Sequence, residues 1–315
     1  PAVTYQDQSE VKIYKHYGLE GNGTSPEETF YLVQADKEVL TGDISKEDVP
    51  NLVELTTKPT GADGYYVASV KFNEGGAKAS DTENVGEFVV KLPTYEHVGK
   101  FEYTLQEVAG NTAGVTYRRD TIKLVVSVIN DGTIRVAGVH TENEGGDKSN
   151  SFSDNKYAAN TLTVSKYVSG NMGDKKTYFQ FELKLEPGTA NGRKTFAENY
   201  AIDYTNATSD KNTTNNISVN GTSVKFWLKS DESISIANLP EGVEWTVNEL
   251  DAEDNPVANG ATNGVYTMTV TGNTGAIKAA GATSTDNKAS FTNNHEGTPD
   301  MGVILDNAPY IALLA

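Results

Sequence analysis

Two lysines occupy matching places in alternating apolar runs of this chain. Lys15 ends the run VKIYK and Lys166 ends the run LTVSK. Side chains along a β-strand point alternately to its two faces, so each lysine shares a face with apolar residues before it. A buried ammonium group without a partner loses its hydration, and its pKa shifts towards the neutral amine. We therefore expect an interacting group inside each core.

Two glutamates and two asparagines are candidates for that group. By the same alternation Glu107 in FEYTLQE and Glu249 in EWTVNE face the core, while Asn155 and Asn293 follow phenylalanine strands. A desolvated lysine becomes a nucleophile, and a desolvated glutamate keeps its proton. Attack of the amine on the asparagine amide, with the acid as proton shuttle, would release ammonia and leave an amide cross-link. Folding would hold the reactants together and exclude water.

The strands that carry these residues recur in one order along the chain. The recurring landmarks are a lysine strand, a glutamate strand, a strand opened by Gly-Val, and a phenylalanine strand followed by asparagine. They read VKIYKHYG and LTVSKYVSG, GKFEYTLQEV and GVEWTVNEL, GVTYRRDTIKLVVSV and GVYTMTVTG, and NSFSDNKY and ASFTNNH. Together with the abundant Thr, Val and Tyr, they predict an all-β protein of two tandem β-sandwich domains. The domains would span residues 1–158 and 159–297, and a tail of residues 298–315 would follow.

The composition excludes several classes of partner and activity. A net charge of −17 over 315 residues argues against nucleic acid and anionic membrane surfaces, which both need a basic face. Without cysteine there is no disulfide framework and no thiol nucleophile. The four histidines lack metal-ligand spacing, and no GxSxG, HExxH or P-loop motif occurs. We predict no metal, no cofactor and no enzyme activity beyond a single self-cross-linking event. The chain begins without signal-peptide features, as expected if such a peptide has been removed.

The lysine strand, the glutamate strand and the FTN ending resemble the backbone pilins of Gram-positive bacteria, whose immunoglobulin-like domains carry Lys-Asn isopeptide bonds. In the second domain TLTVSKYVSG, WTVNE and SFTNN carry the resemblance. It implies a bond between Lys166 and Asn293, with Glu249 as the catalytic acid.

In the first domain the resemblance implies a bond between Lys15 and Asn155, with Glu107 as the catalytic acid. Strict alternation from Phe152 points Asp154 inward, so Asn155 reaches the core only if the strand contains a β-bulge. Asp154 is the alternative acceptor. Its reaction would release water instead of ammonia.

The resemblance also implies polymerisation by a sortase, which joins a lysine near the end of the first domain to a C-terminal sorting signal. Lys148 in GGDKSNSF follows a Gly-rich polar stretch, so we expect it to be exposed. TPDMG at 298–302 is similar to a sorting motif, with Thr298 in place of its leucine and Met301 in place of the threonine whose carbonyl is transferred. The apolar run that follows is shorter than the roughly 20 residues of a membrane helix and looks like a truncated anchor. Alternatively, the tail adds as a strand to a sheet edge.

These features predict the repeating shaft subunit of a secreted pilus, anchored to the cell wall and displayed at the cell surface. Its partners would be identical subunits and a sortase, with minor pilins and host surface ligands as further partners. The alternative is a surface adhesin that binds a host glycan or protein through its loops. An adhesin at a pilus tip needs no acceptor lysine, so Lys148 favours the shaft subunit.

Overall fold

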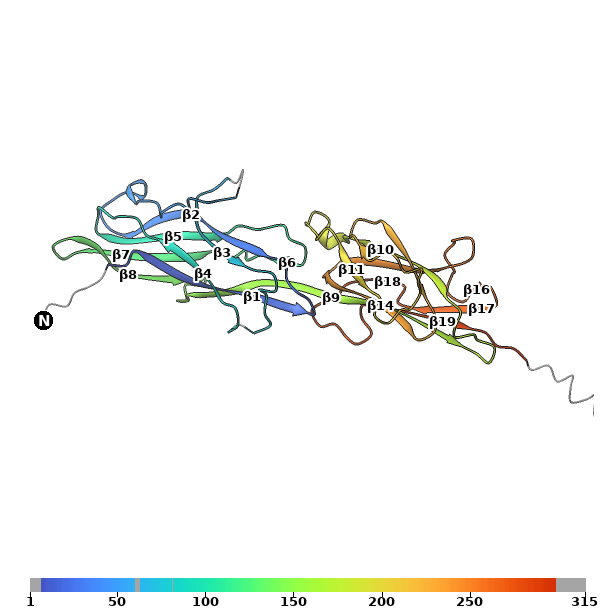
Figure 1. Cartoon of the computed structure of the whole chain (residues 1–315). Coiled ribbons are helices and arrows are strands. Elements are labelled where there is room, and N and C mark those ends of the chain that lie inside the picture. The colour runs from blue at the N-terminus through green and yellow to red at the C-terminus, as the bar shows by residue number, and fades with distance from the viewer. Residues whose placement is uncertain (1–6, 60–62, 81, 299–315) are drawn as a thin grey trace, which may run out of the picture.

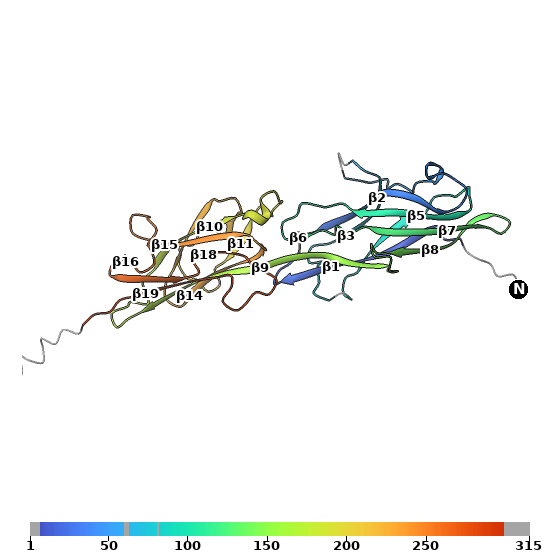
Figure 2. The same cartoon turned by 180° about the vertical axis from the view of Figure 1, so that it is seen from behind.

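The computed structural model describes residues 7–59, 63–80 and 82–298, apart from the side chains of Ser153 and Asp154. These residues form two β-sandwiches that lie end to end in an elongated molecule (Figure 1). The view from behind shows the same arrangement, with the two ends of the described chain far apart (Figure 2). Helical structure in the described residues is limited to two short 3₁₀ turns, Lys46–Asp48 and Thr189–Asn191. No helix in this part of the chain is long and apolar enough to cross a membrane. The predicted all-β, two-domain fold is confirmed.

The first domain packs a five-stranded antiparallel sheet against part of a larger sheet. Alternating apolar residues of both sheets, such as Ile13, Phe30 and Phe101, are completely buried between them. The five strands follow the order β3 (Tyr66–Phe72), β2 (Glu28–Thr41), β5 (Gly99–Glu107), β7 (Ile122–Asn130) and β8 (Ile134–Glu142). The facing strands are β4 (Gly86–Lys91), β1 (Glu10–Gly21), β9 (Ser151–Ser169) and β6 (Val115–Thr116).

The second domain repeats this plan with a four-stranded sheet on one side. Its core contains completely buried Leu162, Phe181 and Phe226. The four strands follow the order β13 (Ser223–Leu228), β10 (Phe179–Glu186), β15 (Glu244–Leu250) and β18 (Thr274–Ala276). The facing strands follow the order β12 (Asn216–Ile217), β11 (Tyr200–Asp203), β14 (Glu232–Pro240), β9, β19 (Lys288–Asn294), β17 (Tyr266–Thr271) and β16 (Thr262–Asn263).

Strand β9 belongs to both domains. Its first half runs parallel to β1, from Ser151 opposite Tyr14 to Ala159 opposite Gly21. Its second half runs parallel to β19 and antiparallel to β14. The closing strand of the first sandwich therefore continues without a loop into the opening strand of the second, as Figure 1 shows.

Further hydrogen bonds join the two domains beside β9. The backbone N–H of Thr195 donates to the carbonyl of Asn111 at 2.7 Å, and the N–H of Ala113 donates to the carbonyl of Thr195 at 2.8 Å. The N–H of Thr24 donates to Oδ1 of Asn238 at 2.6 Å. These bonds join loops of the two domains, so the junction does not depend on β9 alone.

Candidate cross-linking sites

The second domain brings Lys166, Asn293 and Glu249 together in its core, and all three are completely buried. Lys166 comes from β9, Asn293 from the adjacent parallel strand β19, and Glu249 from β15 in the facing sheet. Nζ of Lys166 donates to Oε2 of Glu249 at 2.7 Å. Nδ2 of Asn293 donates to Oε1 of the same carboxylate at 2.7 Å. The carboxylate therefore bridges the amine and the amide.

The surroundings of Lys166 favour its neutral form. Burial lowers its pKa to about 8, and the nearby Glu249 opposes this shift only in part. Two aromatic rings also lie near the amine, with the ring centre of Phe179 at 4.1 Å and that of Phe181 at 5.8 Å. A neutral amine carries the lone pair that a nucleophile needs, so this site is suited to attack on an adjacent carbonyl carbon.

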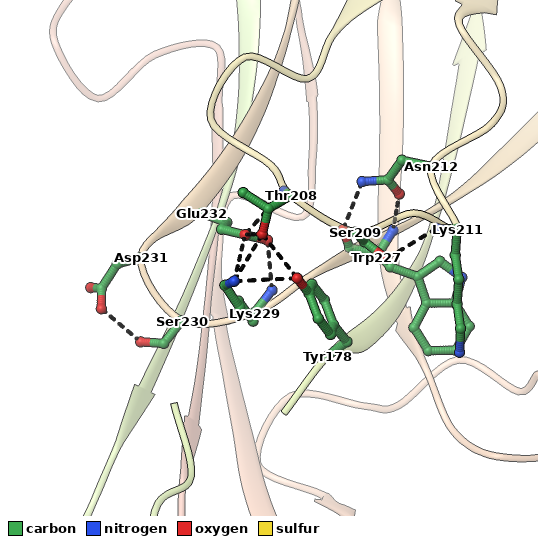
Figure 3. A network of polar contacts seen from close by, with 10 residues as sticks. All are labelled: Tyr178, Thr208, Ser209, Lys211, Asn212, Trp227, Lys229, Ser230, Asp231 and Glu232. Carbon is green, nitrogen blue, oxygen red and sulfur yellow. Dashed lines mark hydrogen bonds and ion pairs between the residues drawn. The ribbon is translucent and has the colours of Figure 1, made fainter. Parts of the chain in front are cut away.

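Glu232 is a second buried carboxylic acid near Lys166, directly opposite it in the antiparallel pairing of β14 with β9. Figure 3 shows that Glu232 turns instead towards Thr208 and Lys229. Its Oε1 accepts from the hydroxyl of Thr208 at 2.5 Å and lies 3.4 Å from Nζ of Lys229. Its Oε2 accepts the backbone N–H of Lys229 at 3.1 Å. Both oxygens of Glu232 are thus engaged elsewhere, and the carboxylate that contacts Lys166 is that of Glu249.

The first domain brings Lys15, Asn155 and Glu107 together in a similar arrangement. Lys15 comes from β1, Asn155 from the parallel strand β9, and Glu107 from β5 in the facing sheet. Nζ of Lys15 lies 2.9 Å from Oε2 of Glu107 and also donates to Oδ1 of Asn155. Nδ2 of Asn155 donates to Oε1 of Glu107. Lys15 and Asn155 are completely buried, so water is excluded from the reacting pair.

A register shift in β9 turns Asn155 towards the core. Lys15 lies opposite Phe152, but two residues later Tyr17 lies opposite Asn155. The strand β9 thus advances by one extra residue over this interval, which is the bulge that the sequence pattern required for Asn155. The side chain of the alternative acceptor, Asp154, lies outside the described part of the structure.

The loop between β8 and β9 presents Lys148 to solvent, as its sequence predicted. The loop folds back on itself through the N–H of Gly146, which donates to the carbonyl of Asn143 at 3.0 Å, and the N–H of Ser149, which donates to the carbonyl of Thr141 at 3.0 Å. Among the described residues, no ion pair holds the amine of Lys148. The proposed donor residue, Met301, lies outside the described residues.

Sequence reasoning missed the groups that hold the two glutamates in place. Oε1 of Glu107 accepts the backbone N–H of Arg118 at 3.1 Å, and Oε1 of Glu249 accepts Nδ2 of Asn263 at 2.7 Å. A backbone N–H leaves no mark in the sequence. Asn263 lies just before the Gly-Val landmark, but an asparagine beside a glycine is more readily interpreted as part of a turn.

Comparison with known protein families gives a match over each domain. Residues 12–158 match the Spy0128-like isopeptide containing domain, FctA. The first domain is therefore similar to this family. Residues 160–295 match a domain of unknown function, DUF7601. The FctA match covers β1, β5 and the half of β9 that carries Asn155, which are the strands of the first site.

Relatives of the whole chain are pilins. A pilin from Streptococcus pyogenes serotype M1 is 29% identical over 247 residues, which span 75% of this chain and 69% of the relative. The crystal structure of the major pilin from Streptococcus pyogenes covers 93% of this chain and 100% of its own, at 20% identity and a TM-score of 0.52, and shows a shared fold. Together with the FctA match, these relatives confirm the predicted resemblance to backbone pilins and support the role of a pilus subunit.

Proposed function

We propose that this chain is the shaft subunit of a sortase-assembled, cell-wall-anchored pilus, and that each domain forms one Lys-Asn isopeptide bond without an external enzyme. The observation that carries the proposal is the buried set of lysine, asparagine and bridging glutamate in each domain. Fully buried lysines are rare in proteins unless they are paired. A matching set in two domains, with each lysine and asparagine on adjacent parallel strands, favours a reaction over chance burial.

The reaction begins with a proton transfer. The ammonium of Lys166 gives a proton to Oε2 of Glu249, which leaves a neutral amine and a neutral acid. The amine then attacks Cγ of Asn293, while the protonated Glu249 supplies hydrogen-bond stabilisation to the developing oxyanion. Burial lowers the pKa of Lys166, which favours its neutral amine, and it also keeps water from competing with that amine.

The intermediate collapses when the bond from Cγ to Nδ2 of Asn293 breaks. Nδ2 already lies 2.7 Å from Oε1 of Glu249, so the carboxyl group can relay a second proton from the attacking nitrogen to the leaving nitrogen. The lysine nitrogen has then lost two protons: one remains on Glu249 and the other leaves within ammonia. The same steps apply to Lys15, Glu107 and Asn155. Each domain reacts once, and no catalyst is regenerated for another substrate.

Assembly would use a different lysine. Lys148 is exposed and its loop precedes β9, whereas Lys15 and Lys166 are completely buried and inaccessible to an enzyme. We propose that a sortase cleaves the peptide bond between Met301 and Gly302 in TPDMG, releases the segment that begins at Gly302, and joins the carbonyl of Met301 to the amine of Lys148 of the next subunit. This linkage would place the protein in the pilus at the cell wall.

Intact-mass spectrometry of the purified chain tests the internal cross-links. We expect a mass lower than the sequence mass by two ammonia molecules, and peptide mapping should give two branched peptides, one joining Lys15 to Asn155 and one joining Lys166 to Asn293. A mass equal to the sequence value would refute the cross-links. Loss of one ammonia and one water would instead assign the first acceptor to Asp154.

A further inference from the structure

The carboxylate of Glu249 has a third donor besides Lys166 and Asn293. Asn263, on the short strand β16, donates from Nδ2 to Oε1 of Glu249 at 2.7 Å and to the backbone carbonyl of Leu250 at 3.2 Å. Oε1 therefore accepts two side-chain amides, those of Asn263 and Asn293, while Oε2 accepts the lysine. Contacts at both oxygens restrict rotation of the carboxyl group about its last side-chain bond.

In the first domain the carboxylate of Glu107 also contacts a lysine, an asparagine amide and a third donor, but the third donor is of a different kind. Oε2 of Glu107 faces Lys15, and Oε1 accepts the amide of Asn155 and the backbone N–H of Arg118. The third donor is therefore part of the main chain in the first domain and a side chain in the second. A third donor to Oε1 of the glutamate thus occurs in both domains, although the group that supplies it differs. This recurrence indicates that the reaction geometry requires a third donor.

Asn263 contacts both Glu249 and a surface cavity. This cavity of about 530 Å³, lined by Tyr178, Trp227 and Tyr266 among others, includes Asn263 in its wall. Glu249 is completely buried and is not among the residues that line it. Asn263 is therefore a cavity-lining residue whose amide contacts Oε1 of Glu249.

We propose that Asn263 is a positioning residue for the second cross-link: its amide holds Oε1 of Glu249 towards Asn293 and Oε2 towards Lys166, and it keeps cavity water from the carboxylate. This role rests on the proposed cross-linking function. A displaced carboxyl group slows proton transfer in both steps, and small displacements of a catalytic group reduce rates by roughly ten- to a hundredfold. Water at Oε1 would also stabilise the charged pair of Lys166 and Glu249 against the neutral pair that reacts.

The test measures both cross-links in one molecule. Full-length chain is recovered unfolded from inclusion bodies, refolded by dilution at several pH values, and quenched in acid at intervals for intact-mass and peptide analysis. The first cross-link serves as an internal control, because Asn263 does not belong to that domain. Asn263→Ala removes the donor. Asn263→Asp keeps the volume of the side chain but can donate only when it is protonated.

We expect Asn263→Ala to form the first link at the wild-type rate and the second at least roughly tenfold more slowly. For Asn263→Asp, we compare the rate of the second link with that of the first, each relative to wild type at the same pH. This ratio should fall as the pH rises, because the ionised side chain no longer donates a hydrogen bond to Oε1 of Glu249. Asn259→Ala is the matched control, since Asn259 accepts the N–H of Val270 at 3.0 Å in the same domain without contact to Glu249. It should leave both rates unchanged.

The outcomes separate this role from the proposed function. If the wild-type chain forms no cross-link, the proposed function fails. If the wild type forms both links and Asn263→Ala forms the second at an unchanged rate, the positioning role is wrong. The positioning role would also be wrong if Asn263→Asp slowed formation of the second link by the same factor at every pH. The side chain would then act through packing alone. If Asn263→Ala does not refold, the pH dependence of Asn263→Asp decides.

Discussion

Lys166 lies directly opposite Phe291 in the parallel pairing of β9 with β19. Lys15 has the same relationship to Phe152 in the pairing of β1 with β9. In both domains the asparagine follows this buried phenylalanine on the same strand, and its amide nitrogen donates to the glutamate that the lysine contacts. The spacing differs by one residue between the domains, and the register shift in β9 compensates for it.

The two buried acids of the second domain should differ in their effect on the cross-link. Glu249→Gln removes the proton acceptor for Lys166 at almost constant volume, so we expect no second link and an intact first link. Glu232→Gln is the matched control, because Glu232 is also buried but contacts Thr208 and Lys229. Intact mass should show one ammonia lost from the first variant and two from the control. A second link at full yield in Glu249→Gln would show that the assigned acid is wrong.

The identity of the first acceptor can be determined by exchanging amide and acid. Asn155→Asp presents a carboxylic acid to Lys15, so the first link should form with loss of water instead of ammonia, and the mass should change accordingly. Asp154→Asn serves as the control and should leave the linked mass deficit at two ammonia molecules. If Asp154 were the acceptor, the wild type would already lose one ammonia and one water. Asn155→Asp would then leave this loss unchanged, and Asp154→Asn would change it to two ammonia molecules.

The stability of an unlinked second domain should depend on pH through Lys166. In Asn293→Ala the amine stays free, with a pKa of about 8 when folded against 10.5 for the exposed side chain. Because the folded state binds the proton less tightly, the free energy of unfolding should rise between pH 8 and 10.5, by about 3 kcal/mol in total. The linked wild type has no free amine at this position, so the stability gap between the two proteins should narrow over this range. Denaturant titrations at pH 7, 9 and 10.5 measure it, and a constant gap would contradict a buried free amine.

Lys148→Ala should abolish covalent polymers when the protein is expressed with its sortase, and it should leave both internal links intact. Lys156→Ala, which removes another exposed amine paired with Glu20, is the control and should polymerise normally. Denaturing gel electrophoresis of fibres gives the first answer, and peptide mapping should show a Lys148 branch that ends at Met301. Fibres that dissociate in hot detergent and retain residues 302–315 would favour strand addition by the tail.

Alternation along single strands was sufficient to predict which residues face the core. Lys166, Glu249 and Asn293 each lie in a regular run, and in such a run the position of one side chain determines the face of the next. The order of the repeated landmarks then indicated which strands share a domain. The bulge before Asn155 was required by the pattern, because Phe152 and Asn155 could not otherwise both face inward.

The continuity of β9 could not be predicted in the same way. Ala158, Ala159 and Asn160 show no alternation and have modest strand propensity, so the pattern is equally typical of a linker. Pairing with neighbours on both sides maintains the strand there, with Gly21 opposite Ala159 from one domain and Leu239 opposite Asn160 from the other. Such tertiary pairing leaves no local signal.

The Gly-Val landmark also concealed a difference between the domains. In the first domain this stretch divides into β6, which pairs with β9, and β7, which crosses to the facing sheet beside β5. In the second domain this stretch forms a single strand, β17, beside β19. Similar apolar residues suit either sheet, because both sheets present one face to the core. The residues between β6 and β7 are where the chain of the first domain crosses from one sheet to the other, whereas the chain of the second domain stays in one sheet.

Because β9 carries both Asn155 and Lys166, it determines how tension would pass through a fibre joined at Lys148 and at the C-terminal tail. A pull on Lys148 enters the backbone just before β9 and travels along this strand to Lys166. The proposed bond to Asn293 would then transfer the load to β19, whose end leads directly to the tail. With that bond formed, residues 167–292 would lie inside a closed covalent loop and bear no load, and most of the first sandwich would lie outside the path. Such a fibre would resist stretching until a covalent bond breaks, with neither sandwich having unfolded.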